Sequence, residues 1–104
     1  MLVPIAMILS LHSSAIIVLE RGSAHWEADD VLEVKVGVIA HAIGPADNQI
    51  VRCVIRNRDH QVISVEDSPI PHIDADDYYR ADIIGPALHE RPARIDCTTK
   101  TGRI

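Results

Sequence analysis

The feature that most constrains the fold is a regular alternation in the middle of the chain. Between positions 31 and 43 every even-numbered residue is apolar: Leu32, Val34, Val36, Val38, Ala40 and Ala42. The odd positions between them include Glu33, Lys35, Gly37 and His41. A repeat of two residues is typical of a β-strand with one buried face and one wetter face. The segment is therefore predicted to be a strand of a sheet that covers a core.

Two more β-branched runs follow this strand, at about 49–56 and 61–66. The turn-forming sequence Gly44-Pro45-Ala46-Asp47-Asn48 precedes the first run, and Asn57-Arg58-Asp59-His60 separates the two. Successive strands with short polar connections are typical of an antiparallel meander. We therefore predict strands at about 31–43, 49–56 and 61–66, paired side by side in that order.

The apolar faces of the last two strands predict the register of their hairpin. The apolar faces lie at odd positions, Val51, Cys53 and Ile55 on one strand and Ile63 and Val65 on the other. A loop with an odd number of residues keeps these positions on one face. A loop of residues 57–59 would pair Cys53 with Ile63, whereas a loop of residues 58–60 would pair Cys53 with Val65. Asp59 adopts the left-handed conformation of such loops more easily than His60, which favours the loop 57–59.

The rest of the chain predicts a β-rich α+β fold. The prolines of Ser68-Pro69-Ile70-Pro71 indicate a connection over 67–73. A short helix is predicted at about 74–84, with Asp74 as its N-cap and Gly85-Pro86 as its stop. A short strand is predicted at 94–97, followed by a frayed tail at 98–104. With 104 residues the chain has the length of one small domain.

The first part of the chain, residues 2–19, is an apolar stretch with three competing interpretations. It could form two short buried strands, at about 3–9 and 15–19, separated by a polar His-Ser-Ser sequence. It could belong to a signal peptide over about 1–24, although no Lys or Arg precedes the apolar run. It could also be a membrane anchor, at the lower limit of the required length. The buried strands are favoured, and a membrane is a predicted partner only in the third case.

Charge and cysteine content limit the environment of the protein. The formal net charge is −5, which disfavours a nucleic-acid role because phosphate binding requires a basic face. Cys53 and Cys97 match no zinc-ligand spacing. They could form one disulfide in an exported protein, or two small buried apolar residues in a cytosolic one. The cytosolic interpretation is slightly favoured, because the evidence for export is incomplete.

One cluster could supply ligands to a divalent cation: His72, Asp74, Asp76 and Asp77. The sequence begins like a calcium-binding loop but departs from it at Tyr79 and Gly85, where a glycine and a bidentate glutamate are required. A solvated loop that leads into a capped helix is therefore favoured. Neither a metal nor a cofactor is predicted.

The candidate binding residues are Arg52, Arg56 and Arg58, which share a parity in or beside one strand. They could bind a phosphate or a carboxylate. Three acidic residues are predicted to neutralise them within the meander: Glu33, Asp59 and Glu66. A self-paired, solvated face is therefore favoured over a recognition face.

The sequence contains no recognisable catalytic or nucleotide-binding motif, so its biochemical function is unknown at this point. A small non-catalytic binding or assembly domain is favoured, with a protein partner or a second copy bound through a sheet edge. One alternative is a small metal protein or enzyme that uses the 72–77 cluster. Another is a translated reading frame that was never selected for a function.

Overall fold

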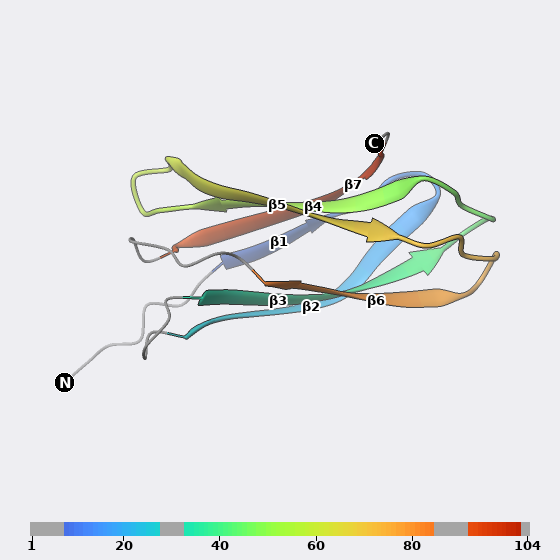
Figure 1. The fold of residues 1–104 in the computed structure, drawn as a ribbon, viewed down its shortest axis with the longest axis horizontal. Coiled ribbons are helices and arrows are strands. Elements are labelled where there is room, and N and C mark those ends of the chain that lie inside the picture. The colour runs from blue at the N-terminus through green and yellow to red at the C-terminus, as the bar shows by residue number, and fades with distance from the viewer. Residues whose placement is uncertain (1–7, 28–32, 85–91, 103–104) are drawn as a thin grey trace.

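The strands of the protein are β1 (Ile8–His12), β2 (Ile17–Glu27), β3 (Glu33–Ala42), β4 (Gln49–Arg56), β5 (Val62–Ile70), β6 (Tyr78–Ile84) and β7 (Arg94–Thr101). The computed structural model describes residues 8–27, 33–84 and 92–102. In this part of the chain the strands form two stacked sheets, with the orders β1-β7-β4-β5 and β2-β3-β6 (Figure 1). The pairing is antiparallel except between β1 and β7, which are parallel. The β-rich prediction is confirmed.

The core lies between the two sheets and is built from the alternating residues that the sequence indicated. On β3 the even positions are all buried: Val34, Val36, Val38, Ala40 and Ala42. On β4 the odd positions face them across the core: Val51, Cys53 and Ile55. Because successive side chains of a strand point to opposite faces, each strand contributes every second residue to this layer. The alternation therefore identified the buried faces of β3 and β4 correctly, and Leu32 lies outside the described residues.

The predicted pairing of the first two meander strands is wrong. Strand β3 pairs with β2 and β6, whereas β4 belongs to the other sheet, where it pairs with β5 and β7. The connection between β3 and β4 crosses from one sheet to the other, and Ala46 in this connection makes an isolated bridge to Ile73. Alternation in the sequence indicates the buried face of a strand but not its neighbouring strand. A short connection between two sheets and a hairpin within one sheet therefore give the same sequence pattern.

The hairpin between β4 and β5 has the predicted odd loop, but its register is wrong. The loop is 58–60, with His60 in the left-handed conformation at φ 65°, because the buried Asn57 side chain accepts hydrogen bonds from the amides of Asp59 and Gln61. A bulge then inserts Ile63 into β5 and shifts the register by one residue. As a result, Cys53 lies opposite Glu66, and Val65 lies opposite Val54 on the outer face.

The predicted helix at 74–84 is wrong. Residues 74–77 form a turn, with Asp76 at φ 66°, and the following residues form β6. Within β6, Ala81 and Ile83 are buried, while Arg80 and Asp82 are exposed. This alternation is typical of a half-buried strand. Burial of one face of β6 therefore decided the structure of this segment, rather than the helix N-cap that was predicted at Asp74. The stop signal Gly85-Pro86 lies outside the described residues.

Two predicted irregular segments are partly strands. Strand β5 continues through most of the predicted connection 67–73 and includes Pro69, which an edge strand tolerates because one side of its backbone is unpaired. Strand β7 extends to Thr101, so the predicted strand at 94–97 is longer than expected and most of the predicted tail 98–104 is ordered. In β7, Ile95 and Cys97 are buried and hold the strand in the core.

The apolar N-terminal stretch contributes two strands, although their bounds differ from those predicted. Strand β1 pairs with β7, and β2 begins with the buried residues Ile17 and Leu19. Residues 1–7, which hold most of the first predicted strand, lie outside the described residues. No helix in the described part of the chain is long and apolar enough to cross a membrane.

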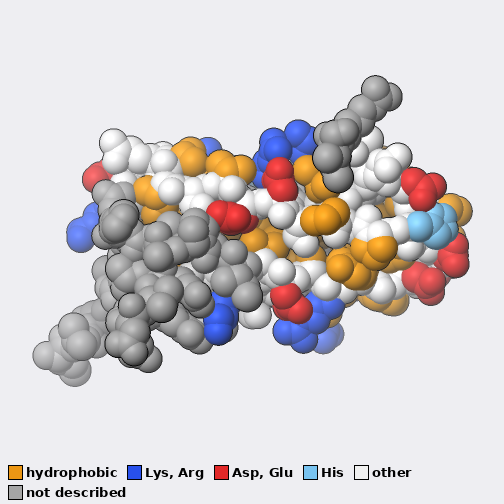
Figure 2. Space-filling model, in the orientation of Figure 1, with side chains coloured by type: hydrophobic (Ala, Val, Ile, Leu, Met, Phe, Trp, Pro, Cys, Tyr) orange, Lys and Arg blue, Asp and Glu red, His pale blue; other side chains and the backbone are white. Residues whose placement is uncertain are grey.

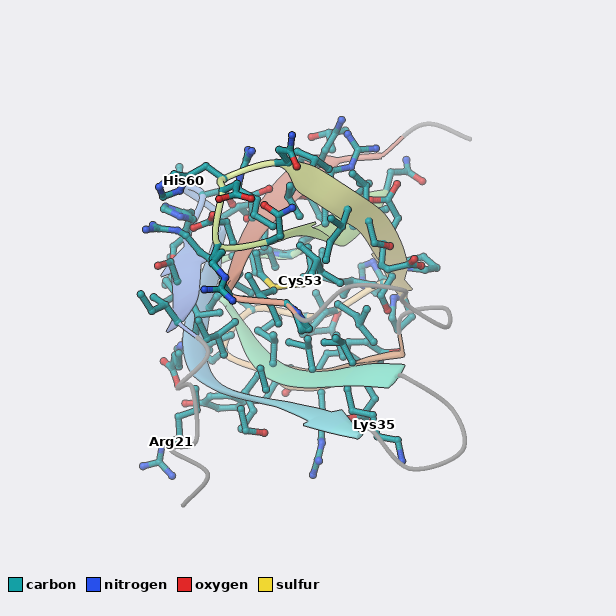
Figure 3. All side chains as sticks on the ribbon, turned by 90° about the vertical axis from the view of Figure 1, so that its left-hand side faces the viewer. Arg21, Lys35, Cys53 and His60 are labelled. Atoms are coloured by element: carbon teal, nitrogen blue, oxygen red, sulfur yellow. A yellow bond between two sulfur atoms is a disulfide. The ribbon has the colours of Figure 1, made fainter. Side chains whose placement is uncertain are left out.

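The two cysteines form a disulfide, contrary to the favoured interpretation of two separate thiols. Cys53 of β4 and Cys97 of β7 are direct partners in the antiparallel pair, with their Cα atoms 4.0 Å apart. Both residues are fully buried, and Figure 3 shows Cys53 inside the sandwich, between the two layers of strands. A spacing of 44 residues gave no indication of this contact, which the pairing of the strands creates.

Candidate functional site

His72 lies at one end of the sandwich and bridges two aspartates. Its Nδ1 is 2.6 Å from Asp47 Oδ1, and its Nε2 is 2.9 Å from Asp74 Oδ1. Both partners are carboxylates, so both ring nitrogens must carry a proton for both hydrogen bonds to form. The hydrogen bond to Asp47, followed by that to Asp74, raises the pKa of His72. Figure 2 shows histidine and acidic side chains gathered at this end of the molecule.

The other two candidate metal ligands point to different neighbours. Asp76 Oδ1 is 3.8 Å from His41 Nε2, and Asp77 contributes backbone hydrogen bonds to the turn and to Ala42. The structure therefore brings His72 and Asp74 together but separates them from Asp76 and Asp77. Among the described residues no three His, Cys, Asp or Glu side chains are grouped so that they could hold a metal ion. The cluster is a set of exposed ion pairs.

A second histidine contact was not predicted from the sequence. His41 Nδ1 is 3.1 Å from Glu20 Oε1, and its ring stacks on Tyr78 with centroids 4.4 Å apart. The three residues come from β2, β3 and β6, in the order in which those strands lie in the sheet. Alternation did place His41 on the wetter face of β3, but the neighbours of that face depend on strand order.

The three candidate arginines do not form one binding face. Arg52 makes a two-pronged contact with Asp67 on β5, through Nε at 2.7 Å and Nη2 at 2.9 Å. The hydrogen bond from Arg52 lowers the pKa of Asp67. Arg56 donates to the carbonyl of His60, and Arg58 is exposed in the turn. Self-pairing was expected, but the partner of Arg52 is Asp67, because the bulge in β5 changed the residues that face β4.

A shallow groove runs over the outer face of the four-stranded sheet, above Ile50, Pro69 and Gly102. It has one part of about 510 Å³ beside His72 and another of about 250 Å³ beside Arg52. The charged groups along it are the ion pairs of His72 with Asp47 and of Arg52 with Asp67, together with Lys100 beside Arg52. The groove therefore offers an apolar floor with few free charges.

A different hollow, of about 220 Å³, lies on the outer face of the three-stranded sheet. Its charged lining residues are Arg21 and Arg80, and Gly37 forms part of the floor. In β3 this glycine is paired with Ser23 of β2 on one side and with Asp82 of β6 on the other. A carbon atom placed at the Cβ position of Gly37 would lie 3.4 Å from Asp82 Oδ1, 3.6 Å from Ser23 Oγ and 3.7 Å from Arg80 Nη2. Polar groups from two strands therefore converge over a residue without a side chain.

The sequence indicated none of the arginines of this hollow. Arg21 lies at a bulge in β2, where the register shifts between Leu19 and Gly22, and Figure 3 shows its side chain extending outward from the sheet. Arg80 was predicted to lie in a helix, at about 74–84, and not in a strand beside Gly37. Only the isolated glycine in an alternating run was a usable signal, since such a glycine can mark the close approach of a ligand.

Compared with protein-family models, with curated proteins and with solved structures, the chain has no significant match.

Proposed function

We propose that the protein is a non-catalytic binding domain that takes up a short extended segment of a protein partner along strand β5. The observation that carries this proposal is that β5 is an edge strand with exposed apolar side chains. Among the described residues it pairs with β4 only, and Val62 and Val65 are 50% and 49% exposed. An edge strand presents unpaired backbone groups to which a partner strand can bind, and adjacent side chains add specificity.

The other three edges are less suited to strand addition. Strand β1 has one exposed large apolar residue, Ile8, and β2 pairs with β3 in two stretches, 17–19 and 22–27, that its bulge separates. Strand β6 presents the charged residues Arg80 and Asp82 on its outer face. Strand β5 combines nine residues with surface valines, and Figure 2 shows hydrophobic side chains at the surface in the region that β5 crosses in Figure 1.

Strand β5 also carries features that restrict pairing. The bulge at Ile63 disturbs its start, and Pro69 lacks an amide hydrogen near its end. Glu66 points toward the inner side, where its carboxylate accepts a hydrogen bond from Ser64 Oγ at 2.8 Å. A bulge, a proline or an inward-pointing charge on an edge strand is known to prevent open-ended growth of a sheet. The edge between the bulge and the proline, residues 64–68, therefore suits one short strand better than a continuous assembly.

A selection from displayed random peptides tests this proposal. We expect peptides selected on the immobilised protein to protect from hydrogen exchange those amides of residues 64–68 that point away from β4. Val65→Lys should abolish their binding, because it replaces an apolar contact with a charge. Ile43→Lys is the matched control, since Ile43 is 54% exposed but lies in the connection between β3 and β4. Selected peptides that ignore Val65→Lys, or that protect another edge, would contradict the proposal.

The buried disulfide supports a role in an oxidising compartment, because disulfides are rare in the reducing cytosol. This inference replaces the cytosolic interpretation of the sequence. Alkylation under denaturing conditions in lysates of its source cells, before and after reduction, measures the state of the two thiols, which are buried in the folded protein. We expect modification only after reduction. Modification of both cysteines without a reductant would contradict the inference, and detection of the protein itself argues against an unselected reading frame.

A further inference from the structure

We propose that the hollow over Gly37 is a binding site for an oxyanion, that is, for a carboxylate or phosphate group. This site lies on the three-stranded sheet and is separate from the strand-addition edge of β5. Its volume of about 220 Å³ is below the roughly 300–1,000 Å³ that is typical of pockets for drug-sized molecules. The hollow therefore suits a small group rather than a large ligand.

Gly37 is the first observation behind this proposal. It lies in the central strand of its sheet, where a glycine is unfavourable because it adds backbone freedom in the unfolded chain and packs nothing. Its φ angle is not positive, so the backbone does not require glycine. A Cβ atom would meet its nearest neighbours at 3.4 Å or more, so the packing does not require glycine either. Because glycine has no side chain, the floor of the hollow stays open.

The charges around this floor are the second observation. Arg80 donates through Nε to Asp82 Oδ1 at 3.1 Å, which holds the guanidinium group beside Gly37 and leaves its two Nη groups for another acceptor. Arg21 lines the same hollow, and the described residues provide it with no hydrogen-bond or ion-pair partner. Ser23 Oγ adds a neutral donor on the opposite side of Gly37.

Two guanidinium groups and a hydroxyl around an open floor match the needs of an oxyanion. Guanidinium groups bind carboxylates and phosphates through parallel hydrogen bonds, which are stronger than those between neutral groups. The protein has a net charge of −5, so attraction over long distances is weak and the local donors must provide the affinity. Asp82 is already engaged by Arg80 and offsets part of the positive charge. We therefore expect a dissociation constant in the millimolar range.

The test is an amide-resonance titration of the full chain with inorganic phosphate and, separately, with acetate, at constant ionic strength. We expect saturable shifts at Ser23, Gly37 and Ile39 with at least one of the two anions. The preferred anion identifies the group that the site takes. Chloride at the same ionic strength is the reference. Shifts with neither anion, or equal shifts with chloride, would overturn the proposal.

Variants separate this site from general charge effects. Arg80→Gln should weaken binding by about tenfold, because it removes a charged donor of the floor. Arg58→Gln removes one charge from an exposed turn and should leave binding unchanged. If Arg80→Gln fails to fold, Arg21→Gln provides the same comparison. Equal weakening by Arg58→Gln would show that the anion responds to net charge alone.

The variant Gly37→Ala distinguishes a glycine that keeps the anion site open from a glycine that is needed only for the fold. The added methyl group fills the floor, so we expect weaker anion binding together with a higher melting temperature, because alanine is favoured over glycine in a strand. Gly44→Ala is the matched control, since no described residue lies within 4 Å of its Cβ position. Unchanged anion binding in Gly37→Ala would contradict the proposal.

Discussion

Cys53 and Cys97 lie directly opposite each other on β4 and β7, and their disulfide joins the two central strands of the four-stranded sheet inside the core. The link closes a loop that contains β5 and β6. The domain has only three aromatic residues, Trp26, Tyr78 and Tyr79, so its core is built from smaller side chains. For a domain of 104 residues with such a core, a covalent link between central strands is a substantial part of the stability.

Removing this disulfide should therefore destabilise the protein strongly. For a separation of 44 residues the chain-entropy relation gives about 4 kcal/mol, within the range of about 2–5 kcal/mol for small secreted domains. We expect Cys53→Ala combined with Cys97→Ala to lower the free energy of unfolding by that amount in urea denaturation. A reductant should destabilise the natural protein and leave the double variant unchanged. A double variant as stable as the natural protein would rule out the link.

The shifted register of the β4–β5 hairpin predicts unequal effects of two apolar substitutions. Ile55 is fully buried, so Ile55→Ala should cost about 2–5 kcal/mol. Val65 is 49% exposed on the outer face, so Val65→Ala should change the free energy of unfolding by about 0.5 kcal/mol or less. Urea denaturation measures both. A large loss in Val65→Ala would instead support the unshifted register that the apolar pattern of β5 predicted.

The bridge from His72 to two aspartates predicts a pH-dependent contribution to stability. Its pKa in the folded protein is raised, mainly by Asp47, so folding favours the protonated ring. The contribution is therefore present below the unfolded pKa, about 6.5, and is lost as the pH rises through the folded value. We expect His72→Gln to destabilise the protein at pH 6 more than at pH 8.5, by a small amount because the side chains are exposed.

A direct titration of His72 by magnetic resonance checks the same contact. Asp47→Asn should lower the pKa of His72, because it removes the carboxylate that contributes most to the shift. Asp59→Asn is the matched control, since Asp59 lies in the turn that closes the β4–β5 hairpin. Equal pKa values of His72 in the natural protein and in Asp47→Asn would contradict the bridge.

The N-terminal strands should be required for folding. Deleting residues 1–20 removes β1, which pairs with β7, and also the buried residues Ile17 and Leu19. The remaining chain would expose the apolar inner faces of both sheets, so we expect it to lose its cooperative thermal transition. Circular dichroism during heating measures this. A cooperative melt of residues 21–104 would show that the first strands are dispensable.

The candidate sites were only partly predictable. The contact between His72 and Asp74 is local in the sequence, and the 72–77 cluster drew attention to it. Asp47, which makes the shorter of the two contacts with His72, comes from a different connection, 25 residues away. Gly37, Arg21 and Arg80 come from three different strands. No local pattern links such residues, since only strand order makes them neighbours.

The sequence by itself determined which residues of β3 and β4 are buried, because the two-residue repeat of side-chain direction is a local property of an extended backbone. Only the tertiary structure decided which strands lie side by side, and with them the disulfide and the partner of Arg52. The outward position of Val65 was decided in the same way: one inserted residue, Ile63, reversed the two faces of β5 relative to β4. Such a bulge changes no side chain's hydrophobicity, so an apolar pattern cannot reveal it.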